Sequence, residues 1–138
     1  MVRNNLLHQV DWDLYGAIVI SPGPGLPKDA GELLGVCLGL QAIVEFFGGS
    51  LSNLAEVVHG QKGVCDYVVY QDLIFKDLSK PLEVGRYHSW VADSLNSPKE
   101  FDILAKIDEN IMAIKHQNLP IYAVQFHPES VLTPQGKL

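Results

Sequence analysis

The stretch that decides the fold of this chain reads Leu33-Leu34-Gly35-Val36-Cys37-Leu38-Gly39-Leu40-Gln41. A short apolar run leads to a cysteine with a glycine two residues away on either side, and a helical pattern follows directly. Small flanking residues let a strand bend sharply into a helix and leave the central side chain at the end of the strand. The stretch therefore predicts a strand, a nucleophile elbow at Cys37 and a helix behind it.

Two interpretations of Cys37 follow from this stretch alone. The first amides and the positive dipole end of a helix favour a thiolate, which is the nucleophilic form of cysteine. A single cysteine in an apolar run is equally well explained as a small buried hydrophobic side chain. The elbow by itself leaves both interpretations open.

Other apolar runs complete a sheet around the elbow. Residues 17–20 and 121–126 are continuous apolar segments typical of strands buried in a parallel sheet. Residues 101–106 and 111–116 alternate and are joined by a short polar connection, which predicts a hairpin, whereas residues 73–81 resemble a short helix and turn. We expect an α/β fold with an open, mostly parallel twisted sheet and helices on both faces.

Composition narrows the class of protein. The chain has 138 residues, of which 47% are hydrophobic and 19% charged, and this predicts one globular domain over residues 1–138. Ten basic and sixteen acidic residues give a net charge of −6 without a basic cluster, which argues against nucleic acid or an anionic membrane as a partner. The sequence shows no signal-peptide core, so a cytoplasmic location is expected. Cys37 and Cys65 form neither a disulfide framework nor a metal-ligand pattern.

A second group of candidate residues lies near the C-terminus. The strand expected at 121–126 delivers His127 at its carboxyl end, where open α/β sheets place their sites. Pro128 keeps the backbone out of a helix, so Glu129 can reach one imidazole nitrogen while the other faces Cys37. His88 is a rival imidazole, but no carboxylate lies within two residues of it.

Three separated motifs together resemble one family. They are Ser21-Pro22-Gly23-Pro24-Gly25, the elbow around Cys37, and Gln125-Phe126-His127-Pro128-Glu129-Ser130. In this order they resemble the class I (triad) glutamine amidotransferases, whose fold is flavodoxin-like, and specifically the glutaminase subunits of anthranilate synthase and aminodeoxychorismate synthase. The resemblance runs from about residue 17 to the end of the chain and includes Arg86-Tyr87-His88-Ser89-Trp90.

The resemblance implies roles for individual residues. Cys37, His127 and Glu129 would be the catalytic triad, and the backbone N–H groups of Gly25 and Leu38 would form the oxyanion hole. The implied substrate-binding residues are Gly23, Pro24, Gly25, Gln41, Ser89 and Trp90. No cofactor and no metal are implied for this subunit. Leu40 stands where family members often have histidine.

The implied activity is hydrolysis of L-glutamine through a cysteinyl thioester. The ammonia would pass to a chorismate-utilising synthase subunit in a heteromer, either for anthranilate and tryptophan or for aminodeoxychorismate and folate. Two alternatives stay open. One is a thiol hydrolase or peptidase built on the same elbow, and the other is a regulatory subunit of the same fold with an inert thiol.

The segment between the first two expected strands is short for a parallel pair. Parallel neighbours need a crossover of a dozen or more residues, usually a helix. Residues 21–32 contain three prolines and three glycines, so no helix fits there. We expect that the sequence lacks segments of the family fold, at the Gly31–Glu32 junction and again before Asp11. A Cα separation well above the 3.8 Å of a bonded trans pair at Gly31–Glu32 would support this expectation.

Overall fold

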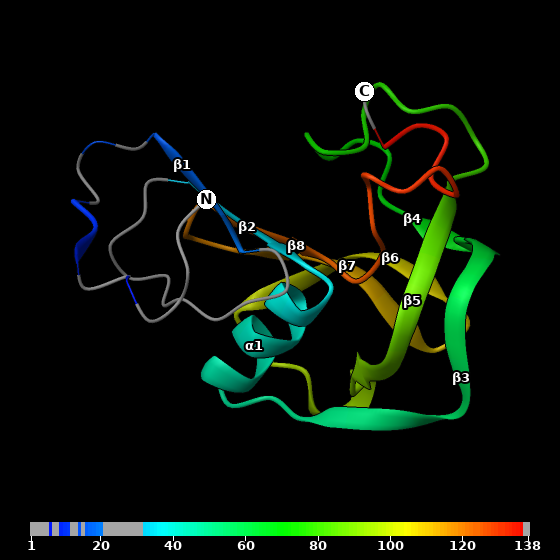
Figure 1. Ribbon diagram of the computed structural model, residues 1–138, viewed down its shortest axis with the longest axis horizontal. Helices are drawn as coiled ribbons and strands as arrows, with labels where there is room; N and C mark the ends of the chain where they lie inside the picture. Colours follow the sequence, from blue (N-terminus) through cyan, green and yellow to red (C-terminus); the bar gives the residue numbers. More distant parts are fainter. Residues whose placement is uncertain (1–5, 7–8, 12–13, 15, 21–31, 137–138) are drawn as a thin grey trace.

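The fold is described from a computed structural model, which covers residues 6, 9–11, 14, 16–20 and 32–136. Its elements are β1 (Ala17–Ile20), β2 (Glu32–Val36), α1 (Leu38–Phe46), β3 (Leu51–Val64), β4 (Tyr67–Val68), β5 (Glu83–Ala92), a 3-10 turn (Ser94–Asn96), β6 (Phe101–Ile107), β7 (Asn110–His116) and β8 (Ile121–Val124). Figure 1 shows α1 against one face of the larger sheet.

The larger sheet has six strands in the order β1-β2-β8-β7-β6-β4. Strands β1, β2 and β8 are parallel, and the pairings of β8 with β7, β7 with β6, and β6 with β4 are antiparallel. The two-residue connection between β6 and β7 permits only an antiparallel pair. The expected α/β class and the hairpin are confirmed, and the sheet is mixed, with its parallel part confined to three strands.

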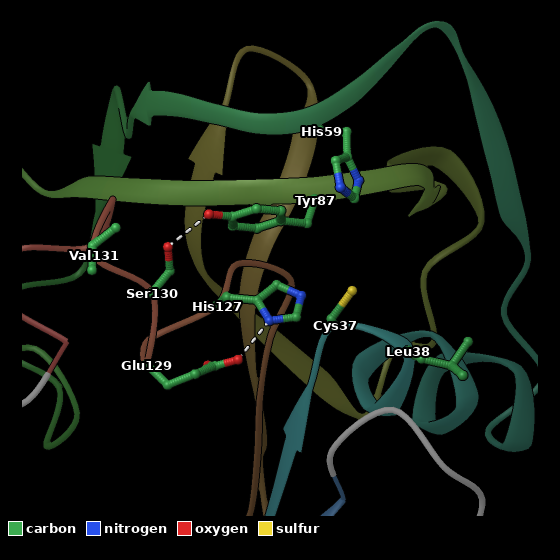
Figure 2. Close-up of a pocket in the computed structure, with 8 residues that line it drawn as sticks. All are labelled: Cys37, Leu38, His59, Tyr87, His127, Glu129, Ser130 and Val131. Carbon is green, nitrogen blue, oxygen red and sulfur yellow. Dashed lines mark hydrogen bonds and ion pairs between the residues drawn. The ribbon is translucent and has the colours of Figure 1, made fainter.

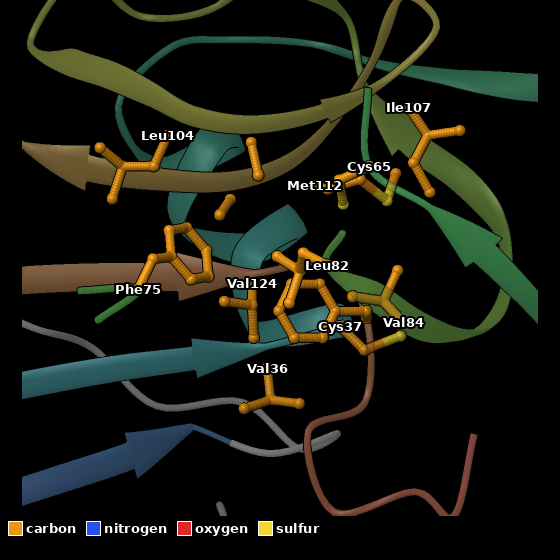
Figure 3. Close-up of a cluster of buried hydrophobic side chains, with 13 residues drawn as sticks. Val36, Cys37, Cys65, Phe75, Leu82, Val84, Leu104, Ile107, Met112 and Val124 are labelled. Carbon is orange, nitrogen blue, oxygen red and sulfur yellow. The ribbon is translucent and has the colours of Figure 1, made fainter. Parts of the chain in front are cut away.

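The two faces of this sheet carry different parts of the core, because successive strand residues point to opposite faces. In β8, Ile121 and Ala123 belong to the cluster that contains Ile43 and Val44 of α1. Val124 belongs to the cluster on the other face, together with Phe75 and Leu82. Both cysteines, Cys37 and Cys65, are members of this second cluster (Figure 3).

Helix α1 ends in a Schellman motif. Gly48 has a φ of 84°, and its N–H donates to the carbonyl of Glu45 over 3.0 Å. The N–H of Gly49 donates to the carbonyl of Val44 over 2.9 Å. The glycine pair therefore ends the helix after Phe46.

A second, two-stranded sheet is made by β3 and β5. The strands are antiparallel, with register shifts between Asn53 and Val58 and between His59 and Gln61. Strand β3 is exposed along most of its length and lies on the outer side of β5 (Figure 1). Both strands contribute to the surroundings of Cys37, β5 through Tyr87 and β3 through His59.

The structure departs from the expectation for one segment and leaves another untested. Residues 73–81 form turns instead of a short helix, with i to i−3 hydrogen bonds from Phe75 to Asp72 and from Leu78 to Phe75. The expectations for residues 21–31, including the Gly31–Glu32 junction, lie outside the described residues, as does most of the segment before Asp11. No helix among the described residues is long and apolar enough to cross a membrane.

Position 35 requires a glycine, because β2 and α1 approach each other closely there. A Cβ atom at this position would lie 2.7 Å from Cδ1 of Ile43 and 2.9 Å from the carbonyl carbon of Gly39. We predict that Gly35→Ala lowers the free energy of unfolding by about 1–3 kcal/mol, the usual cost of overpacking. Gly16→Ala is the control, because a Cβ there would meet no atom within 4 Å. Denaturant unfolding of both variants tests this, and equal stabilities would contradict it.

Candidate active site

Cys37 lies at the turn between β2 and α1. It is the N-cap residue of the helix and has a φ of 54°, a left-handed conformation that is uncommon for a residue other than glycine. Its N–H donates to the carbonyl of Val124 over 2.8 Å, which extends the β2–β8 pairing by one residue. Strained backbone of this kind is concentrated at functional sites. The geometry is that of the expected elbow.

His127 follows β8, so it leaves the sheet at the same edge as Cys37. Its Nδ1 lies 2.7 Å from Oε1 of Glu129. A carboxylate only accepts hydrogen bonds, so Nδ1 carries the proton and Nε2 is free to accept one. Figure 2 shows Cys37 and Glu129 on opposite sides of the imidazole. The arrangement places a thiol, a base and an orienting carboxylate in sequence.

The backbone of His127 is hydrogen-bonded to β5 and to the residues that follow it in the sequence. The N–H of His127 donates to the carbonyl of Gly85 in β5 over 3.1 Å. The carbonyl of His127 accepts from Oγ1 of Thr133 over 2.7 Å and from the N–H of Ser130 over 3.1 Å. The imidazole is thus held by fixed backbone as well as by Glu129.

A pocket of about 650 Å³ opens beside these groups. Its lining residues are Cys37, Leu38, His59, Tyr87, His127, Glu129, Ser130 and Val131 (Figure 2). The ring of Tyr87 packs edge-on against His127 at a centroid distance of 5.2 Å, and its hydroxyl lies 2.9 Å from Oγ of Ser130. Tyr87 therefore forms the wall of the pocket that contacts the imidazole.

The pKa values of Cys37 and Glu129 are shifted in opposite directions. Burial raises the pKa of Cys37, and the charge of Glu129 adds to this, although hydrogen bonds from the Leu38 N–H and from Gln125 oppose it. Partial burial would raise the pKa of Glu129, but its hydrogen bond with His127, a backbone hydrogen bond and the charge of His127 together lower it. Glu129 is therefore held as a carboxylate.

The rival imidazole, His88, is placed differently. It is buried and is not among the residues that line the pocket. Burial lowers the pKa of His88 to about 4, and the neighbouring charge of Arg86 contributes. A neutral, buried imidazole away from the pocket wall is poorly placed to exchange a proton with Cys37.

The other predicted site residues differ in whether they line the pocket. Leu38 lines the pocket, whereas Ser89 and Trp90 do not, and Gly23, Pro24 and Gly25 lie outside the described residues. Gln41 is buried under the elbow. Its Nε2 donates to the carbonyl of Trp90 over 2.8 Å and to Oε1 of Gln125 over 3.2 Å, so both amide protons are already engaged.

Gln125, Tyr87 and His59 contribute to the site, although the sequence analysis gave them no role in it. Gln125 is fully buried, and its Nε2 lies 3.6 Å from Sγ of Cys37. A polar amide at the end of an otherwise apolar strand, two residues before His127, is the signal that could have identified it. Tyr87 and His59 come from β5 and β3, and their contribution depends on the packing of the second sheet.

The comparisons with known proteins agree with this geometry. A family model described as glutamine amidotransferase class-I matches residues 1–138. The chain belongs to the class-I glutamine amidotransferase family. Anthranilate synthase component 2 of Haemophilus influenzae is 45% identical over 132 residues, covering 86% of this chain. Anthranilate synthase component 2 of Methanocaldococcus jannaschii is 46% identical over 134 residues, covering 88% of this chain. This chain spans only about two thirds of either relative, 66% in both cases.

Solved structures support the assignment of the amidotransferase fold. A protein from Thermoplasma acidophilum described as a GMP synthase subunit superposes with a TM-score of 0.68 at 30% identity, covering 77% of this chain and 52% of that one. A glutamine amidotransferase from Thermotoga maritima has a TM-score of 0.59 at 19% identity, covering 70% of this chain and 40% of that one. The second likeness shows the fold alone.

The two cysteines of this amidotransferase should differ in reactivity. Cys37 lines the pocket, whereas Cys65 is buried and burial raises its pKa to about 12. At pH 8 a thiol of that pKa is ionised only to about one part in ten thousand. We predict that iodoacetamide modifies Cys37 and spares Cys65 in the folded protein, as measured by peptide mass spectrometry. Comparable labelling of both would contradict this, and labelling in denaturant controls for peptide detection.

Proposed function

We propose that this chain is a glutaminase that hydrolyses the side-chain amide of L-glutamine through a thioester on Cys37. The observation that carries the proposal is the arrangement of Cys37, His127 and Glu129 around one pocket at the carboxyl ends of β2 and β8. A nucleophile and a base beside one pocket, with a carboxylate that orients the base, are what covalent acyl transfer requires.

The reaction follows from the roles of these groups. Sγ of Cys37 attacks the amide carbon of glutamine while Nε2 of His127 takes the thiol proton. The same nitrogen then returns that proton to the leaving nitrogen, which departs as ammonia. Water activated by His127 attacks the thioester, releases glutamate and restores the thiol.

The negative oxygen of the tetrahedral intermediate needs hydrogen-bond donors. The N–H of Leu38, at the first position of α1, already acts on the sulfur and lies at the pocket. We assign it as one oxyanion donor and, from the resemblance of the Ser21–Gly25 motif, the N–H of Gly25 as the other. One such donor contributes roughly 3–4 kcal/mol of barrier lowering.

The relatives named anthranilate synthase component 2 support a partner for this reaction. We propose that ammonia passes from the pocket to a chorismate-utilising synthase subunit, with which the chain forms a heteromer. Component 2 of anthranilate synthase is the assignment that these relatives favour over the aminodeoxychorismate branch.

One observation favours a second candidate, a regulatory subunit without glutaminase activity. Burial raises the pKa of Cys37, so the thiol form is favoured in the protein without a substrate. Glutamate release, measured with and without a chorismate-utilising subunit, distinguishes the two. Turnover that requires the partner supports the glutaminase, and no turnover under either condition supports the regulatory subunit.

We predict that Cys37→Ser reduces glutamate release to background while leaving association with the synthase subunit intact. A hydroxyl is close in size to a thiol but is a much weaker nucleophile with an imidazole base. Cys65→Ser is the matched control and should retain wild-type turnover, because Cys65 is buried away from the pocket lining. Turnover by Cys37→Ser together with loss in Cys65→Ser would overturn the assignment of the nucleophile.

The imidazole assignment gives a further prediction. His127→Ala should lower thioester formation by about 100- to 10,000-fold, the usual contribution of a general base. Glu129→Ala should lower it less, because water can replace an exposed orienting group, and His88→Ala should mainly raise the glutamine concentration required. The thioester is measured by mass spectrometry after rapid acid quench. If His88→Ala abolished the thioester and His127→Ala did not, the roles would be reversed.

A further inference from the structure

Behind Cys37 runs a chain of two buried amide side chains. Nε2 of Gln41 donates to the carbonyl of Trp90 over 2.8 Å and to Oε1 of Gln125 over 3.2 Å. Nε2 of Gln125 in turn donates to Sγ of Cys37 over 3.6 Å, a distance suited to a sulfur acceptor. We call Gln41 and Gln125 the amide relay. It connects a backbone carbonyl of β5 to the sulfur of the elbow.

The carbonyl of Trp90, at one end of the relay, determines the donor and the acceptor of every hydrogen bond in it. The carbonyl of Trp90 can only accept, so Gln41 must present its NH₂ group there. The second proton of that NH₂ points at Gln125, whose facing atom must then be the oxygen. The NH₂ group of Gln125 is left facing Cys37. A main-chain carbonyl therefore determines that the sulfur meets a donor.

We propose that Gln125 is a positioning residue that holds the Cys37 sulfur as a hydrogen-bond acceptor, and that Gln41 fixes the orientation of Gln125. The proposal rests on the proposed function in one respect, that Cys37 is the nucleophile. A donor aimed at the sulfur stabilises the thiolate relative to the thiol, and it also limits rotation of the side chain.

The burial of the relay supports a role of this kind. Gln125 has none of its surface exposed and Gln41 has 6%. An amide buried without hydrogen bonds destabilises the folded chain, so two adjacent buried amides persist only when they are paired. An apolar side chain of similar length would fill the same space without that requirement. The hydrogen bond to Cys37 is the feature that an apolar side chain could not provide.

The charged and titratable groups that face Cys37 are those that line the pocket with it. His127 and Glu129 approach from the segment after β8, and His59 lines the pocket from β3. The first turn of α1, on the other side of the sulfur, has no acidic residue. Burial and Glu129 raise the pKa of Cys37, whereas the N–H of Leu38 and the amide of Gln125 lower it. Substitution of Gln125 leaves all the charged groups in place.

The test measures the rate of Cys37 alkylation by iodoacetamide from pH 6 to 11.5 in the folded chain, because the pKa of Cys37 is raised above its ordinary value. Gln125→Met keeps the length of the side chain and removes the donor. It should move the midpoint of the profile about one unit higher, which lowers the rate at pH 7.5 about tenfold. Gln41→Met should move the midpoint in the same direction by less, because Gln125 can then turn its oxygen toward the sulfur. The double variant should match Gln125→Met, as expected for residues in one chain.

Gln71→Met is the matched control, because Gln71 is exposed in a turn away from the pocket lining. Circular dichroism verifies the fold of each variant, and if Gln125→Met does not fold, the profile of Gln41→Met decides. A midpoint within about 0.2 units of the wild type in the deciding variant, an equal shift in Gln71→Met, or additive shifts in the double variant would each overturn the relay. Alkylation requires neither glutamine nor a partner, so a chain that proved inactive as a glutaminase would leave this test unaffected.

Discussion

The site depends on the parallel pairing of β2 with β8. Val36 is in register with Val124, and the N–H of Cys37 donates to the Val124 carbonyl over 2.8 Å, so both strands end at the same level. The chain turns into α1 after one strand and bends at residues 125–126 after the other. Cys37 and the imidazole of His127 line one pocket for this reason, although they are 90 residues apart in the sequence.

The same pairing explains why the segment after β8 approaches the sulfur twice. Gln125 comes directly after the register ends and lies under Cys37, and His127, two residues further, lies beside it in the pocket. The sulfur thus has an amide donor on its buried side and a base on its open side, which is the environment needed to offset the burial that disfavours its ionised form.

Apolar runs made the central parallel strands predictable, because strands buried on both faces carry few polar residues, and two alternating segments with a short polar connection made the hairpin predictable. The grouping of Cys37, His127 and Glu129 around one pocket was predictable from the elbow and from the spacing of His127 and Glu129. Strand β3 was not, because most of its residues are exposed and its pairing with β5 is set by tertiary contact instead of by a pattern of its own. The turns of residues 73–77 were mistaken for a helix, since Ile74, Phe75 and Leu78 are apolar for packing against the sheet rather than for helical periodicity. The contact between Gln125 and Cys37 could not be predicted from the sequence, because it depends on the register of β8 with β2.

Strand β5 serves both halves of the site through its backbone. The carbonyl of Gly85 holds the N–H of His127, and five residues along the strand the carbonyl of Trp90 orients Gln41. The antiparallel ladder with β3 fixes both carbonyls, so their positions depend little on the side chains of β5. Gly85 is the exception: a Cβ atom there would lie 2.9 Å from Oγ of Ser130 and 2.9 Å from Cβ of Leu132. The glycine lets the segment that carries His127 lie directly against β5, and the smaller sheet thereby becomes part of the candidate site beside Cys37, His127 and Glu129.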